Sequence, residues 1–201
     1  GFPPPRLKEM IQHENLFSKL QKRGKRCTFA NSYWLDNVDH IPLRRQSVTT
    51  VMTLAALGKV RSKPELRTNR AVNHDITRWT MHTRGYNGEL ITPEEAADHL
   101  LGVAAEHDFT LFEYLLTDRA GHSGNPELVF KTLDTLERFL PRASHFAEKP
   151  KHLFLLCSDH GNIEDLSTVT HTKNPVPLVA LGNRAKDFHA CESLADVTPS
   201  I

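Results

Sequence analysis

The sequence predicts an α/β protein that has a largely parallel sheet with helices on both faces. Apolar, strand-like runs alternate with amphipathic helices through the second half of the chain. Two of these runs, DFTLFEYLLTD at residues 108–118 and KHLFLLCSD at residues 151–159, end in an aspartate. Strands that are joined by helices usually pair in parallel, and ligands bind where their carboxyl ends meet. The two aspartates are therefore expected at one edge of the sheet.

Helix signals separate the predicted strands. The tetrapeptide TPEE at residues 92–95 has the form of a capping box with proline at the first helical position, and Asn125-Pro126 opens a second helix. A broken amphipathic helix comes before a short strand at residues 26–30, and a last strand is expected at residues 176–181. The order of these elements is that of a helix-covered sheet.

The length of 201 residues favours one domain over residues 1–201. Residues 32–91 interrupt the regular pattern. They contain one helical stretch, from Ser47 to Leu57, which Gly58 can end, and are otherwise irregular. We expect a small insertion or cap there.

Composition and charge are those of a globular protein. The chain has 39% hydrophobic and 24% charged residues and a formal net charge of +1, which gives no reason to expect a nucleic-acid partner. No apolar run reaches the ~20 residues that span a bilayer, so we expect no membrane role. Three widely spaced cysteines, Cys27, Cys157 and Cys191, do not form a disulfide framework and favour a reducing, cytoplasmic location.

Three short motifs in the last part of the chain carry chemistry: TDRAGH at residues 117–122, SDHGN at residues 158–162 and HTKNPVP at residues 171–177. Together they supply two carboxylates and three imidazoles, namely Asp118, His122, Asp159, His160 and His171. This mixture suits Zn²⁺ or Mn²⁺, whereas Ca²⁺ prefers oxygen ligands and structural zinc sites usually contain thiolates. One Asp-His pair is common in ordinary turns, so the prediction rests on the conjunction of all three motifs.

The run CSDHGNIEDLSTVTHTKNPVPLVALG at residues 157–182 resembles the C-terminal signature of cofactor-independent phosphoglycerate mutase and its relatives in the alkaline-phosphatase superfamily. The D-x-x-x-H spacing of Asp118 and His122 matches the family's other metal motif, in the expected order. The chain is most similar to small metalloenzyme-domain relatives. The resemblance covers residues 109–201 well and the first hundred residues only loosely.

The resemblance implies two divalent metal ions, Mn or Zn. Asp118, His122 and His171 would hold one ion, and Asp159 and His160 would hold the other. It also implies an alkaline-phosphatase-like fold, in which an aspartate in an apolar-D-G context and a Ser or Thr nucleophile complete the second metal site.

Neither of these last two motifs is visible in the sequence. Asp36 and Asp39, the earliest aspartates, follow no apolar strand and stand in no D-G step. We therefore expect a fragment that is incomplete at the N-terminus, with the nucleophile upstream of it, and that is also truncated at the start of a last helix.

Ser47 and Thr49 offer a rival source of the nucleophilic hydroxyl. Both lie at the predicted start of the helix in residues 47–57, where the N-terminal dipole can hold phosphate and lower a hydroxyl pKa. An ordinary serine N-cap also explains Ser47. We favour the N-cap, because no D-G strand comes before this helix to supply the missing carboxylate.

The activity that the resemblance implies is metal-dependent phosphoryl transfer on a small phosphate ester, by a phosphomutase or a phosphatase. Only 117 residues precede Asp118, too few for the large second domain of the mutase, so this general activity is favoured over phosphoglycerate mutase itself. The expected partner is a small phosphorylated metabolite, and Arg44, Arg45 and Arg119 are candidate phosphate contacts.

The alternative is a non-catalytic metal-binding or structural module that lost its nucleophile segment. All five predicted ligands are present, which favours a truncated enzyme, inactive by itself, over a decayed one.

Overall fold

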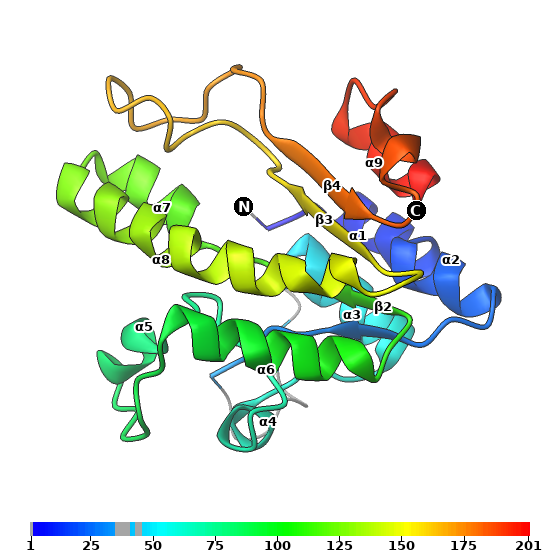
Figure 1. The fold of residues 1–201 in the computed structure, drawn as a ribbon, viewed down its shortest axis with the longest axis horizontal. Helices are drawn as coiled ribbons and strands as arrows, with labels where there is room; N and C mark the ends of the chain where they lie inside the picture. The colour runs from blue at the N-terminus through cyan, green and yellow to red at the C-terminus, as the bar shows by residue number, and fades with distance from the viewer. Residues whose placement is uncertain (1, 35–40, 43–45) are drawn as a thin grey trace. The chain divides into compact units, whose positions relative to one another are not determined.

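The computed structural model describes residues 2–34, 41–42 and 46–201, which form two compact units, Gly1–Glu113 and Tyr114–Ile201. Helices and strands alternate along the chain, which confirms the α/β class (Figure 1). The single domain over residues 1–201 and the insertion at residues 32–91 stay predictions.

The first unit contains six helices and two strands among its described residues. They are, in chain order, α1 (Pro5–His13), α2 (Leu16–Lys22), β1 (Cys27–Phe29), α3 (Val48–Leu57), α4 (Lys63–Arg67), α5 (Trp79–His82), α6 (Pro93–Ala105) and β2 (Phe109–Leu111). Strands β1 and β2 pair in parallel, with Cys27 opposite Phe109. The fully buried Phe17 ring of α2 meets the Phe109 ring edge-on at 6.0 Å. The parallel pairing expected from the sequence is confirmed for these two strands.

The predicted helix ends of this unit are confirmed in detail. Thr92 and Glu95 form the capping box of α6, because the Thr92 amide donates to Glu95 Oε2 at 2.8 Å and the Glu95 amide donates to Thr92 Oγ1 at 3.2 Å. Ser47 caps α3, accepting from the Thr50 amide at 3.2 Å. Gly58 ends α3 at φ 72°, a left-handed conformation that glycine adopts without steric cost.

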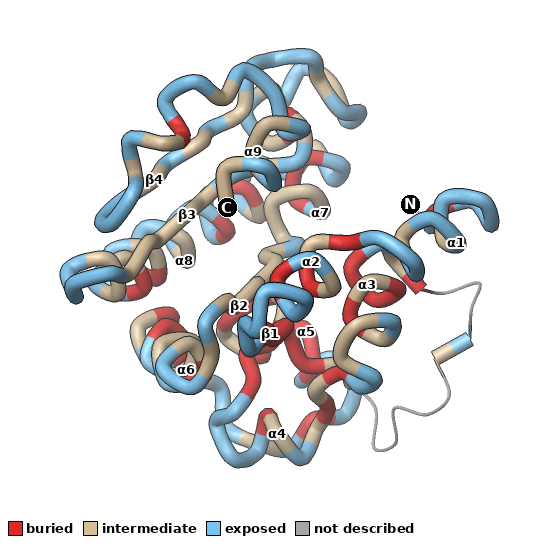
Figure 2. Tube along the Cα trace, turned by 90° about the vertical axis from the view of Figure 1, so that its right-hand side faces the viewer, coloured by how far each residue is buried: buried red, intermediate tan, exposed pale blue. Residues whose placement is uncertain are grey.

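The second unit contains three helices, two strands and two 3₁₀ turns. They are, in chain order, α7 (Leu116–Ser123), α8 (Pro126–Ser144), a turn at His145–Glu148, β3 (Leu153–Cys157), β4 (Leu178–Gly182), a turn at Ala185–Phe188 and α9 (Leu194–Ser200). Buried side chains of this unit come mainly from α7 and α8, namely Ala120, Val129, Thr132, Phe139 and Ala143. Strands β3 and β4 contain no buried residue (Figure 2).

Strands β3 and β4 pair antiparallel, with Cys157 opposite Leu178 and Leu153 opposite Gly182. A largely parallel sheet was expected, and this pair is an antiparallel exception to it. Parallel strands need a crossover connection, usually a helix, whereas residues 158–177 form none and return the chain directly. The connection is the long loop that runs out from β3 and back to β4 in Figure 1.

Asp118 does not end a strand, contrary to the sequence-based expectation. Strand β2 stops at Leu111, and Asp118 lies in the first turn of α7. A carboxylate is stabilised there by the partial positive charge of the helix N-terminus. No helix in the described part of the chain has both the length and the apolar character that crossing a bilayer requires.

Candidate metal centre

Helix α7 supplies the first two predicted ligands. Asp118 and His122 are four residues apart, so their side chains share one face of the helix. His122 Nε2 lies 3.2 Å from Asp118 Oδ1. The D-x-x-x-H spacing thus reflects one helical turn.

The third predicted ligand, His171, lies in the loop between β3 and β4. Its Nε2 atom is 3.1 Å from His122 Nε2 and 3.2 Å from Asp118 Oδ1. The three side chains can each offer one ligand atom, all within 4.8 Å of one another. Two nitrogens and one oxygen therefore form a small triangle.

The orientation of His122 leaves the correct nitrogen available for this triangle. Its Nδ1 atom lies 2.6 Å from the Val169 carbonyl oxygen, which can only accept a hydrogen bond. Nδ1 therefore carries the proton, and in the neutral ring Nε2 keeps its lone pair. Histidine metal ligands are commonly oriented by such a bond.

The size of the triangle fits a divalent ion. Edges of 3.1–3.2 Å correspond to a tetrahedron whose centre lies about 1.9–2.0 Å from each corner, close to the ~2.0–2.2 Å of Zn–N and Zn–O bonds. The donor chemistry and the geometry of these three residues are thus compatible with zinc.

Asp159 and His160 lie beside the triangle, just beyond the carboxyl end of β3. His160 Nε2 is 3.6 Å from Asp118 Oδ1 and 3.6 Å from Asp159 Oδ2. Its ring stacks on that of His171, with centroids 3.6 Å apart and an angle of 16° between the planes. The Asp159 side chain is 85% exposed against 26% for His160, so this pair is more open than a closed metal site. All five predicted ligands therefore lie together, and their role as ligands stays a prediction.

Close packing joins α7 to the loop. A Cβ atom at Gly121 would overlap the side-chain oxygen of Asn162, so only glycine permits this approach. Asn162 is buried, and neither its Oδ1 nor its Nδ2 atom has a hydrogen-bond partner among the described residues. Asn162 belongs to the SDHGN motif, but its packing against α7 was not anticipated from the sequence.

Glu164 is the other residue of the site that sequence reasoning missed. Its carboxylate accepts hydrogen bonds from the Thr172 hydroxyl, from Asn174 Nδ2 at 2.9 Å and from the Asn162 amide at 2.6 Å. These bonds, chiefly that from Thr172, lower the pKa of Glu164 to about 2, so the group is ionised at neutral pH. An acidic residue between the SDHGN and HTKNPVP motifs was the available signal.

The remaining candidates are the predicted nucleophiles and phosphate contacts. Ser47 and Thr49 belong to the first unit, where Ser47 caps α3 and the Thr49 hydroxyl donates to Glu113 Oε1. Arg119 is exposed on α7, next to Asp118. The other candidates fall outside the described residues, namely Asp36, Asp39, Arg44 and Arg45.

Fold and site together define an α/β protein with a histidine and carboxylate metal centre as its candidate functional site. The model of the Metalloenzyme superfamily matches residues 85–201, which is more than half of the chain. The chain therefore belongs to the Metalloenzyme superfamily. Membership implies binding of divalent metal, for which the triangle of Asp118, His122 and His171 is the candidate site.

Three curated relatives carry the description 2,3-bisphosphoglycerate-independent phosphoglycerate mutase. The protein from Antithamnion sp. is 29% identical over 104 residues, 47% of this chain and 20% of the relative. The protein from Pseudomonas fluorescens is 33% identical over 123 residues, which are 56% of this chain and 24% of the relative. The protein from Mycoplasma genitalium is 33% identical over 110 residues, which are 52% of this chain and 22% of the relative. The chain thus spans about a quarter or less of their length. No solved structure matches it significantly.

Replacing Gly121 by alanine should disrupt the candidate site, because the added methyl group displaces Asn162 and the loop that carries His171. We expect a loss of about 1–3 kcal/mol in the free energy of unfolding and weaker Zn²⁺ binding, measured by denaturation and calorimetry. Gly102→Ala is the control: a Cβ atom meets nothing within 4 Å there, in the interior of α6.

Adding Asn162→Ala to the Gly121→Ala chain removes the overlapping atoms and should restore part of the loss. Equal stability and Zn²⁺ affinity of Gly121→Ala and the unmodified chain would show that the close approach is unimportant.

Proposed function

We propose that this chain is the metal-binding part of an enzyme that transfers the phosphoryl group of a small phosphate ester, as a phosphomutase or a phosphatase. The observation that carries the proposal is the triangle of Asp118, His122 and His171, with Asp159 and His160 beside it. Relationship to phosphoglycerate mutases supports this chemistry.

Two divalent ions, zinc or manganese, are proposed at the site. The triangle would hold one ion through two nitrogens and one oxygen, and Asp159 with His160 would contribute to the second. Such ions polarise phosphoryl oxygens and neutralise the charge that develops on them during transfer. The residues of the chain orient the ligands: the Val169 carbonyl holds the His122 ring, and the His171 ring stacks on that of His160.

The proposed substrate is a small phosphorylated metabolite. Arg119 is exposed and adjacent in sequence to Asp118, and its guanidinium group matches phosphate oxygens in geometry and charge. Arg44 and Arg45 stay candidate contacts from the sequence alone. Three free cysteines, Cys27, Cys157 and Cys191, support a cytoplasmic location.

The nucleophile is proposed to come from a segment of the enzyme other than residues 1–201. Ser47 is used as the N-cap of α3, which explains its presence without catalysis. Thr49 has the better geometry of the two, because its hydroxyl donates to a carboxylate, the arrangement that activates nucleophilic hydroxyl groups. The Thr49 and Glu113 pair is the rival source within the chain.

Calorimetry with Zn²⁺ should reveal one tighter and one weaker site, since three protein ligands serve one ion and two serve the other. Asp118→Ala or His122→Ala should weaken the tighter site by at least the ~100-fold that lost supporting contacts can cost, because a direct ligand is removed. His189→Ala removes an exposed histidine of the same unit and should leave both sites unchanged. Unchanged affinity of Asp118→Ala would contradict the assignment.

Assays against p-nitrophenyl phosphate and phosphoglycerates should find no turnover by this chain, and metal-dependent turnover by a longer protein that supplies the nucleophile. Activity of the chain that Thr49→Ala abolishes and Ser47→Ala spares would place the nucleophile on α3 instead. A longer protein that binds metal but turns over no phosphate ester would favour a metal-binding module.

A further inference from the structure

The loop at residues 158–177 carries three of the five predicted ligands but contains no helix and no extended strand pair. One isolated bridge crosses it: the Thr172 amide donates to the Gly161 carbonyl oxygen at 2.9 Å. His160 and His171 flank this bridge, and their rings stack. A single backbone bridge is weak support for two ligands whose separation must stay constant.

Glu164 adds a side-chain connection at the same place. One carboxylate oxygen, Oε2, accepts from the Asn162 amide, two residues after His160. The other, Oε1, accepts from the Thr172 hydroxyl, one residue after His171, and from Asn174 Nδ2. One oxygen therefore binds the arm of the loop that follows His160, and the other binds the arm that follows His171.

The backbone at Gly161 leaves room for the Glu164 side chain and its hydrogen bonds. A Cβ atom at Gly161 would lie 2.7 Å from Glu164 Oε1 and would overlap the Thr172 hydroxyl oxygen. The connection thus passes directly over Gly161, and the residue that follows His160 has no side chain to obstruct it.

We propose that Glu164 is a positioning residue, whose carboxylate ties the turn after His160 to the turn after His171 and so holds the two imidazoles at the separation that the metal centre requires. The inference rests on the proposed function for its metal readout. Glu164 acts through its neighbours and not as a ligand, since its described partners are Asn162, Thr172 and Asn174.

Two variants distinguish a positioning role of Glu164 from a purely electrostatic one. Glu164→Gln loses the charge but keeps the length. Its amide can still accept from the Asn162 amide and donate to the Thr172 hydroxyl, which is able to accept, so both arms stay connected although the bond from Asn174 Nδ2 is lost. Glu164→Asp keeps the charge but is one methylene shorter, so it cannot reach both arms. A positioning role predicts that glutamine retains function better than aspartate, and a purely electrostatic role predicts the reverse order.

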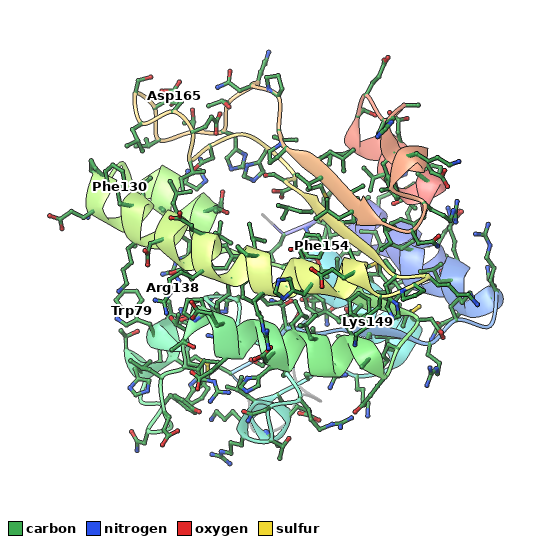
Figure 3. All side chains as sticks on the ribbon, in the orientation of Figure 1. Trp79, Phe130, Arg138, Lys149, Phe154 and Asp165 are labelled. Carbon is green, nitrogen blue, oxygen red and sulfur yellow. The ribbon has the colours of Figure 1, made fainter. Side chains whose placement is uncertain are left out.

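The matched control is Asp165→Ala. Asp165 carries the same charge in the same loop, but its carboxylate accepts locally from the Ser167 amide at 2.9 Å. It lies on the outer part of the loop, away from the strands (Figure 3). Losing it removes a charge without cutting the connection between the arms.

The experiment measures Zn²⁺ affinity by calorimetry and, in the metal-free chain, hydrogen exchange of the Asn162 and Thr172 amides by NMR. Glu164→Ala and Glu164→Asp should bind Zn²⁺ at least ~10-fold more weakly and exchange both amides faster. Glu164→Gln should recover most of the affinity, and Asp165→Ala should match the unmodified chain.

Unchanged affinity and exchange in Glu164→Ala would overturn the inference, as would full affinity in Glu164→Asp with loss in Glu164→Gln. If the unmodified chain binds no Zn²⁺, the proposed metal centre fails by itself. The exchange rates then still decide: faster exchange in Glu164→Ala and Glu164→Asp, but not in Asp165→Ala, supports Glu164 as the residue that holds the loop, and equal rates in all variants refute it.

Discussion

The antiparallel pairing of β3 with β4 is the constraint on which the candidate metal centre depends. Because Cys157 lies opposite Leu178, the carboxyl end of one strand and the amino end of the other meet at the same edge of the pair. The loop between them therefore begins and ends at one place, and His160 and His171, eleven positions apart in the sequence, can stack. A helical crossover would have carried His171 to the other end of the sheet.

Helix α7 supplies the other two residues of the triangle, and their position depends on the loop between β3 and β4. Asp118 and His122 share a helical face, but they reach His171 only where α7 lies against the loop. Gly121 permits that approach, and the His122 ring is held by a carbonyl oxygen of the loop. The contacts that position the ligands are thus also contacts that pack α7 against the loop. Metal binding is therefore expected to stabilise the fold of the unit.

Local chemistry predicted much of this structure from the sequence. The ends of α3 and α6 follow from Ser47, Gly58 and the capping box at Thr92. The five candidate ligands came from three short motifs and from the family that these motifs resemble, and their role as ligands stays a prediction. The direction of β4 was not predicted, because it depends on the connection at residues 158–177, which forms no crossover helix. The helical position of Asp118 was not predicted, because the apolar run at residues 108–118 does not show that β2 stops at Leu111. Glu164 escaped notice because its role appears only when the fold brings Thr172 and Asn174, eight and ten residues away in the sequence, to its carboxylate.

The central claim is that Asp118, His122 and His171 bind one divalent ion. Anomalous diffraction at the zinc edge, from crystals of this chain grown with Zn²⁺, tests it directly. The account predicts a peak about 2.0–2.2 Å from Asp118 Oδ1 and from the Nε2 atoms of His122 and His171. Zinc found only at other surface positions, or bound through Nδ1 of His122, would contradict it.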